Sequence, residues 1–174
     1  GLLEVGGGMT ALAALGLAVA ATHHRAHDST SSPSPPPQPS HVVLTDGHPD
    51  CVRNIHVCLA MNQQHGLLDC EQSPVYAQLL HWADAEAIDR VKTLGNSRSE
   101  DEGFGLVVGS DCLFFTSFHG HLLRLLERLL GAQGRGVFLQ PRRAGSLEKW
   151  VCLAQAQGWD VQVLEDYLPE VRSK

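Results

Sequence analysis

The sequence predicts an α/β fold, a doubly wound and mostly parallel sheet with helices on both faces. Short apolar runs alternate with longer segments in which apolar residues recur at helical spacing. The run 104–110 is apolar throughout, as a central parallel strand buried on both faces must be. At 174 residues the chain is expected to form a single domain over 1–174 with a sizeable core.

The first elements lie at the N-terminus, where an apolar strand over 1–5 runs into Gly6, Gly7 and Gly8 and then into an apolar helix over about 10–21. Glycines there let the backbone turn sharply and approach a ligand, and the free N–H groups of the helix point at that position. The pattern therefore predicts a nucleotide-binding turn. A glycine-rich tight turn without a ligand is the alternative.

The next stretch, residues 22–40, is rich in His, Ser and Pro and is expected to be a disordered insertion. Apolar alternation and turn residues then predict the remaining elements. In order, these are a strand over 41–46, a helix over about 47–62, a strand over 75–82, a helix around 87–91, a strand over 104–110, a helix over 117–131, a strand over 134–141, a helix over 146–157 capped by Ser146, and a sixth strand over 160–164.

Polar and aromatic side chains stand at the ends of these strands. Asp46 can accept hydrogen bonds from both hydroxyls of a ribose, although it could instead cap the following helix. Trp82 can lie against an adenine ring, with Asp84 accepting from its amino group, or Trp82 can simply close the edge of the core. Asp111 follows strand 104–110. Ligands of open α/β sheets bind beyond the carboxyl ends of the strands, so Asp111 is expected across one crevice from the glycine turn.

The charges of the chain restrict which ligands and partners are expected. Glu4, two residues before the first glycine, would repel a pyrophosphate and attract an ammonium group such as that of S-adenosylmethionine. The net charge of −6 offers no general attraction for nucleic acid. Five cysteines without a C-x-x-C pair suggest reduced thiols in an intracellular protein and no zinc site. The apolar run 11–21 is too short to span a bilayer, so no membrane association is expected.

Several segments carry a family resemblance: Leu3-Glu4-Val5-Gly6-Gly7-Gly8-Met9-Thr10, Leu44-Thr45-Asp46-Gly47, Arg53-Asn54 with Asn62-Gln63, Leu80-His81-Trp82, Ser110-Asp111-Cys112-Leu113-Phe114 and Pro141-Arg142-Arg143. Together they resemble the calmodulin-lysine N-methyltransferases (methyltransferase family 16). These enzymes belong to the class I, seven-β-strand group of S-adenosylmethionine-dependent methyltransferases, which have a Rossmann-like fold. The combination is far more specific than any one motif.

The resemblance implies a function and a set of site residues. S-adenosyl-L-methionine would be the cofactor, a lysine ε-amine the acceptor and calmodulin the partner. The cofactor would be lined by Glu4, Gly6, Gly7, Gly8, Asp46, Trp82 and Ser110. Asp111 would face the incoming lysine as the catalytic residue, and the substrate would be bound by Phe114, Arg142 and Arg143. A monomer in the cytoplasm is expected, with the nucleus as a second compartment.

The chain also departs from the family pattern in two respects, and two other functions remain as alternatives. Relative to the family, the chain is expected to lack an N-terminal segment and the seventh strand, which puts its activity in doubt. Gly6-x-Gly8-x-x-Ala11 also satisfies the fingerprint of NAD(P)-dependent oxidoreductases, although no Tyr-x-x-x-Lys pair accompanies it. A catalytically inactive, methyltransferase-like binding module is the non-enzymatic alternative.

Overall fold

The computed structural model describes residues 1–27, 39–71, 73–95 and 103–165. Five strands form one sheet in the order β3-β2-β1-β4-β5, and every pairing is parallel. The strands are β1 (Leu2–Glu4), β2 (Val42–Asp46), β3 (Val75–Leu79), β4 (Phe104–Ser110) and β5 (Leu130–Leu139). The helices are α1 (Leu12–His27), α2 (Pro49–Gln64), α3 (Ala85–Gly95), the 3-10 turn η1 (Thr116–Phe118), α4 (His119–Leu129) and α5 (Ser146–Ala156). The predicted Rossmann-like α/β fold is confirmed.

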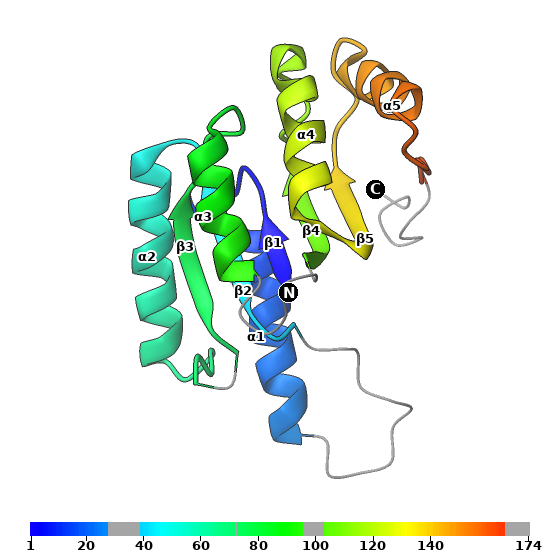
Figure 1. The fold of residues 1–174 in the computed structure, drawn as a ribbon. Helices are drawn as coiled ribbons and strands as arrows, with labels where there is room; N and C mark the ends of the chain where they lie inside the picture. The colour runs from blue at the N-terminus through cyan, green and yellow to red at the C-terminus, as the bar shows by residue number, and fades with distance from the viewer. Residues whose placement is uncertain (28–38, 72, 96–102, 166–174) are drawn as a thin grey trace.

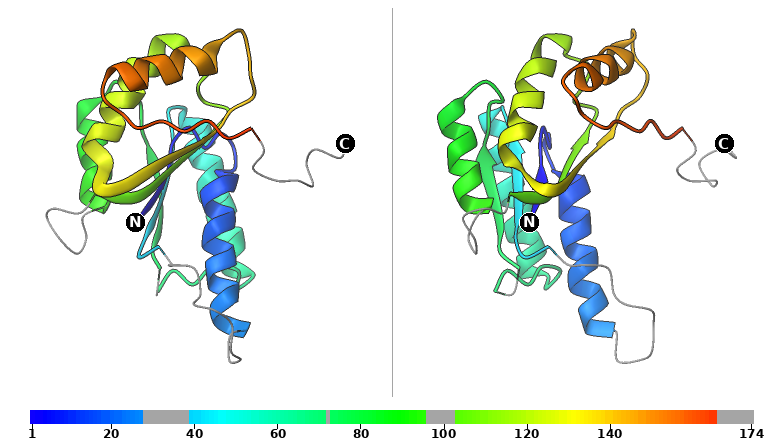
Figure 2. Two further views of the ribbon diagram at one scale, coloured as in Figure 1. Left: turned by 90° about the vertical axis from the view of Figure 1, so that its right-hand side faces the viewer. Right: turned by 45° about the vertical axis from the view of Figure 1, so that its right-hand side comes forward.

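Helices cover both faces of the sheet, and the alternation of side chains along the strands explains how (Figures 1 and 2). Leu2 of β1 packs in one apolar cluster with residues of α1 and α2, such as Ile55. Its neighbour Leu3 points to the opposite face and packs with residues of α3, α4 and α5, such as Leu122 and Trp150. Successive residues of a strand face opposite ways, so both faces of the sheet are buried.

The register of the sheet brings the predicted site residues to one level. Glu4 of β1 pairs with Leu44 of β2 and with Val108 of β4. Two residues farther along these three strands stand Gly6, Asp46 and Ser110. The carboxyl ends of all three strands therefore meet at one edge of the sheet, the upper edge in Figure 1.

Two expectations about helices differ from the structure. Helix α1 continues to His27, so residues 22–27 of the predicted insertion are helical, while residues 28–38 lie outside the described part. Gly145, in a left-handed conformation with φ of 72°, stands at the N-cap of α5 in place of Ser146. Ser146 is buried in the first turn of α5, and its Oγ has no hydrogen-bond partner among the described residues.

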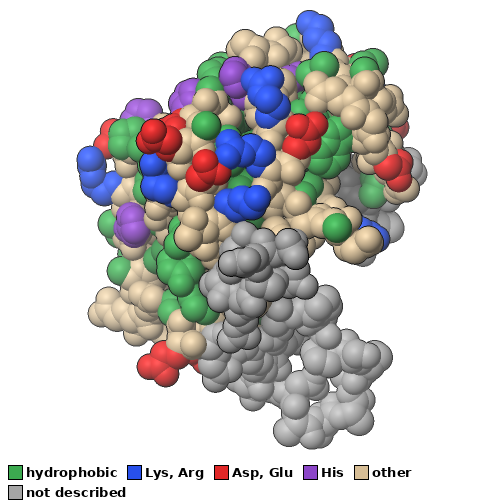
Figure 3. Space-filling view, in the orientation of Figure 1, with side chains coloured by type: hydrophobic (Ala, Val, Ile, Leu, Met, Phe, Trp, Pro, Cys, Tyr) green, Lys and Arg blue, Asp and Glu red, His purple; other side chains and the backbone are tan. Residues whose placement is uncertain are grey.

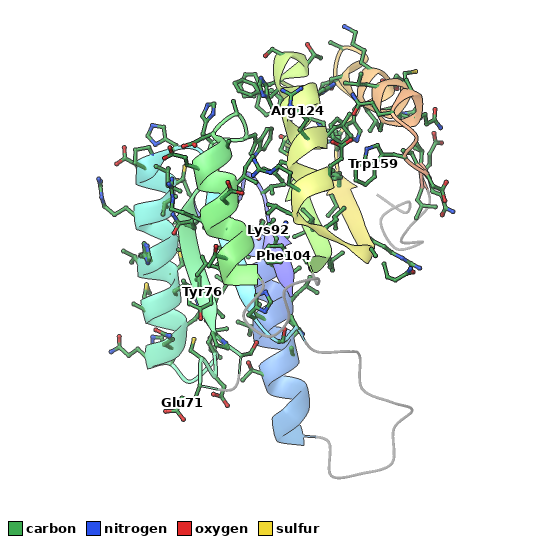
Figure 4. All side chains as sticks on the ribbon, viewed as in Figure 1. Glu71, Tyr76, Lys92, Phe104, Arg124 and Trp159 are labelled. Atoms are coloured by element: carbon green, nitrogen blue, oxygen red, sulfur yellow. The ribbon has the colours of Figure 1, made fainter. Side chains whose placement is uncertain are left out.

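The prediction of a sixth strand over 160–164 is wrong, because these residues form no strand. The segment alternates like a strand, but a strand also needs a neighbour for its backbone N–H and C=O groups. Val161 packs partly against the core next to Trp159, which lies beside α5 (Figure 4). Val163 and Leu164 are exposed. Side-chain packing thus anchors this segment without sheet pairing.

The face of β4 and β5 on the side of α1 is partly open. A groove of about 360 Å³ lies there, lined by Ala13, Leu17, Leu106, Val108, Gly109, Val137 and Leu139. Val137 and Leu139 are each about half exposed, at 49% and 48%. None of the helices within the described residues combines the length and apolarity that a membrane-spanning segment needs.

Candidate functional site

The glycine turn after β1 has the sharp geometry that the sequence predicts. Gly6 and Gly8 both have left-handed backbones, with φ of 64° and 60°, a conformation that costs residues with a Cβ about 1–2 kcal/mol. A Cβ on Gly6 would stand 3.3 Å from both Cys112 Cβ and Trp82 Cζ2, whereas one on Gly8 would meet nothing within 4 Å. Gly8 therefore borders open space that a ligand can enter, and Gly6 lies against two packed side chains.

Asp46 ties this turn to the end of β2. Its Oδ2 accepts a hydrogen bond from the Gly8 N–H at 2.8 Å, and its Oδ1 accepts from the His48 N–H at 2.8 Å. A carboxylate offers about four acceptor positions, so two remain for the hydroxyls of a ribose. The alternative role as helix cap is wrong, because His48 is the N-cap of α2 and its side chain accepts from Asp50.

Thr45, which sequence reasoning missed, braces the same turn from β2. Its buried hydroxyl donates to the Glu4 carbonyl at 2.7 Å, and its own carbonyl accepts from the Gly7 N–H at 2.8 Å. Thr45 and Asp46 therefore hold the chain at three points, the Glu4 carbonyl and the N–H groups of Gly7 and Gly8. The β-branched Thr in a strand end is too common to signal this role in advance.

Glu4 is almost fully buried, with 2% of its surface exposed, and faces the N-terminus of α1. Its Oε2 accepts a hydrogen bond from the Ala14 N–H at 2.7 Å. Burial raises the pKa of Glu4, while the backbone N–H groups of Ala14 and Ala13 act in the opposite direction. Glu4 thus satisfies donors in the first turn of the helix, and its predicted attraction for a cofactor ammonium group stays a prediction.

Aromatic side chains form a rim beside the turn. Trp82, partly buried, meets Phe118 edge to face at 6.3 Å between ring centroids, and Phe118 also meets His81 at 5.7 Å. Phe114 and Phe115 lie with their centroids 4.0 Å apart and are 40% and 55% exposed. This aromatic rim continues into the first turn of α4, where the His121 ring lies 6.1 Å from that of Phe118. A flat ligand ring could stack there.

Asp84, the predicted partner of an adenine amino group, serves a different purpose in the structure. Its Oδ1 accepts hydrogen bonds from the Glu86 and Ala87 N–H groups at 3.0 and 3.1 Å. These donors belong to the first turn of α3, so Asp84 acts as the N-cap of that helix.

Asp111 follows Ser110, which is exposed at the end of β4, and has a left-handed backbone with φ of 49°. Its Oδ2 pairs with Arg143 Nη2 at 2.9 Å, and its Oδ1 accepts from Gln140 Nε2 at 3.2 Å. Sequence reasoning placed Asp111 and Arg143 in separate roles, on catalysis and on substrate docking. The structure brings them together as an ion pair.

Arg142 is also paired within the chain. It contacts Glu148 at 3.7 Å and forms a second ion pair with Glu165. Both arginines expected to dock an acidic partner therefore have intramolecular counter-charges. Charges of both signs are also interspersed over the face that carries α3 and α4 (Figure 3), where Arg128 pairs with Asp89.

Neither a reactive cysteine nor a metal cluster is seen at this site in the part of the chain that the structure describes. All five cysteines are free thiols. Burial raises the pKa of Cys112 to about 12, so this thiol beside Gly6 is protonated at neutral pH and is no nucleophile. The described ranges hold no group of three or more His, Cys, Asp or Glu side chains placed to bind a metal ion.

Comparison with known proteins supplies the next observation. No protein-family model matches the chain. Over 134 residues it is 30% identical to a calmodulin-lysine N-methyltransferase of Arabidopsis thaliana, which covers 76% of this chain. The similarity supports a methyltransferase family. It does not single out one member, because the chain spans only 40% of the length of that relative. The all-parallel sheet is consistent with a methyltransferase fold.

Proposed function

We propose that the chain transfers methyl groups from S-adenosyl-L-methionine to the ε-amine of a protein lysine, and that calmodulin is the substrate. The observation that carries this proposal is the 30% identity to a protein whose name states that activity. The carboxyl edge of the sheet adds support, since it gathers the glycine turn, Asp46, Trp82 and Asp111 on neighbouring strands.

The residues at this edge fit such a cofactor. The space beside Gly8 is open, Asp46 has two acceptor positions left for the ribose, and Trp82 presents a ring for the adenine. Ser110 is exposed at the same level of the sheet. When bound, the cofactor supplies an electrophilic methyl group on a sulfonium, and the protein has to place the acceptor in line with it.

The protein's own contribution is to orient the amine. Displacement at a methyl sulfonium needs little acid–base help, but it needs a neutral amine held in a desolvated position. Asp111, with 41% of its side chain exposed, can accept a hydrogen bond from the amine and orient it. Phe114, three residues on, offers an apolar surface to the aliphatic part of a lysine.

Arg142 and Arg143 are the proposed contacts for an acidic substrate, at the cost of opening their internal ion pairs. An exposed ion pair contributes at most about 1 kcal/mol to stability, so a substrate carboxylate can replace the internal partner of each arginine with little loss of free energy. We expect the double substitution Arg142→Glu and Arg143→Glu to slow methylation of calmodulin more than it changes cofactor affinity. Arg135→Glu, an exposed position within β5 away from its carboxyl end, is the matched control. Equal rates for the double variant and the parent would exclude this docking role.

One experiment separates the candidate functions. Titration calorimetry with S-adenosylhomocysteine and with NAD, followed by a methyl-transfer assay on unmethylated calmodulin, has three distinct results. Binding of S-adenosylhomocysteine with transfer supports the proposal. Binding of NAD alone would indicate an oxidoreductase. Binding of S-adenosylhomocysteine without transfer would exclude calmodulin as the substrate and favour an inactive binding module.

A further inference from the structure

The turn 111–114 at the end of β4 is held from the neighbouring strand. The Asp111 N–H donates to the Leu139 carbonyl at 2.8 Å, which fixes the start of the turn against the last residue of β5. Asp111 has a left-handed backbone, which is strained for a non-glycine residue and has to be stabilised by surrounding contacts. Besides the Leu139 carbonyl, the contacts on Asp111 include the ion pair to Arg143 and a hydrogen bond from Gln140, the next residue of the chain after β5.

Gln140 uses both ends of its side-chain amide on this turn. Its Oε1 accepts a hydrogen bond from the Leu113 N–H at 2.8 Å. Its Nε2 donates to Asp111 Oδ1 and to the Pro141 carbonyl, each at 3.2 Å. Because the Leu113 N–H can only donate, it fixes which amide atom is oxygen, and the NH₂ group then faces the Asp111 carboxylate.

The opposite side of the turn is held from α4. The buried ring of His119 lies with Nε2 2.8 Å from the Leu113 carbonyl and packs edge to face against Trp150, at 5.4 Å between centroids. Both peptide groups of Leu113 are therefore occupied, one by Gln140 and one by His119. Of these two residues, Gln140 alone also reaches the Asp111 carboxylate, where it donates to Oδ1 while Arg143 pairs with Oδ2 at 2.9 Å.

We propose that Gln140 is a positioning residue for methyl transfer: it holds the Asp111 carboxylate in the orientation that receives the substrate amine. This inference rests on the proposed function and adds a residue to it. An amide is suited to the task because one planar group supplies an acceptor for Leu113 and a donor for Asp111 at the same time. Neither a carboxylate nor an aliphatic side chain of similar size can do both.

Two substitutions separate the two contacts. Gln140→Leu removes both, whereas Gln140→Glu keeps an acceptor for the Leu113 N–H and loses the donor to Asp111. Gln155→Leu, at an exposed position on α5, is the matched control. Three quantities are measured for each variant: kcat and KM for methylation of unmethylated calmodulin, Kd for S-adenosylhomocysteine, and hydrogen exchange of the Leu113 amide by NMR.

In Gln140→Leu we expect kcat to fall roughly tenfold to a hundredfold, as for a reacting group displaced by about 1 Å. Kd for S-adenosylhomocysteine should stay within about twofold, and the Leu113 amide should exchange faster because its acceptor is gone. In Gln140→Glu the Leu113 amide should stay protected while kcat still falls. That fall reports the action of side chain 140 on the Asp111 carboxylate, because the substitution removes the donor and adds a like charge, whereas the uncharged Gln140→Leu shows the loss of the donor without that charge.

Three results would overturn the inference: a kcat in Gln140→Glu equal to that of the parent, a loss of cofactor affinity proportional to the loss of rate, or unchanged Leu113 exchange in Gln140→Leu. If the parent transfers no methyl group while it binds S-adenosylhomocysteine, the proposed function fails instead. The exchange rate of Leu113 then still decides whether Gln140 holds the turn.

Discussion

Replacing Asp46 by alanine tests the centre of the candidate site, because one carboxylate serves both the fold and the proposed cofactor. In the structure it accepts from the Gly8 N–H, which is partly buried, and from the His48 N–H, which is exposed. Loss of the side chain should therefore loosen the glycine turn and remove the partner of the ribose hydroxyls.

The size of the effect follows from these two bonds. A hydrogen bond to a charged group contributes about 1.5–3 kcal/mol when buried and less when exposed, so Asp46→Ala should lower the free energy of unfolding by about 2 kcal/mol. Asp46→Asn keeps one acceptor oxygen and should lose about half as much. Loss of the ribose contacts should weaken binding of S-adenosylhomocysteine at least about tenfold, which is about 1.4 kcal/mol.

Urea denaturation measures the first effect and titration calorimetry the second. Asp50→Ala is the control, since Asp50 lies nearby on α2 and pairs with Arg53 at 2.7 Å on an exposed surface. It should change stability by at most about 1 kcal/mol and leave affinity unchanged. An unfolding free energy of Asp46→Ala equal to that of the parent would refute the bracing role of Asp46. An unchanged affinity would refute its assignment to the ribose.

Three further predictions concern the glycine turn, the glutamate before it and the core. Gly6→Ala should lower the free energy of unfolding by about 1–2 kcal/mol, because a Cβ is disfavoured at this φ of 64° and would press on Trp82; a urea midpoint equal to that of the parent would contradict this. Burial raises the pKa of Glu4 above its ordinary value of 4.5, so the folded state favours protonated Glu4. Stability from this group is therefore present below pH 4.5 and is lost as pH rises through the folded pKa, and the parent should lose stability relative to Glu4→Gln between pH 4 and pH 8. A shift in the other direction in urea melts at the two pH values would show that the helix N–H groups outweigh burial. Leu122→Ala, at a fully buried position, should cost about 2–5 kcal/mol in the same assay, and a loss below 1 kcal/mol would mean that the core relaxes around it.

The parts of the fold that sequence could predict are those with a local signal. The glycine turn, the strand ends at Asp46 and Asp111, and the alternation of strands and helices all follow from neighbouring residues. Hydrogen bonds between distant residues have no such signal. The bond from Gly8 to Asp46 joins residues 38 positions apart, and that from Gln140 to Asp111 joins residues 29 apart. Both depend on the register between strands.

The errors share a physical cause, which is tertiary context. Residues 160–164 alternate as a strand does, yet strand formation requires a partner that the periodicity of one segment cannot reveal. Ser146 resembles a helix cap in sequence, but Gly145 takes that place because the chain enters α5 through a left-handed residue. The pairing of Arg143 with Asp111 likewise arises from the adjacency of β4 and β5, and residue type alone suggested two separate roles.

The left-handed backbone at Asp111 implies a trade between folding stability and chemistry at this position. An aspartate there costs about 1 kcal/mol more than a glycine, which takes up the same angles without steric conflict. Glycine at position 111 would relieve this strain but would lose the ion pair to Arg143 and the hydrogen bond from Gln140, so an evolution experiment that rewards only thermal resistance should tolerate Asp111→Gly, with impaired methyl transfer. Under selection that also demands transfer, the carboxylate should be kept together with its strain, and stabilising changes should accumulate elsewhere in the chain.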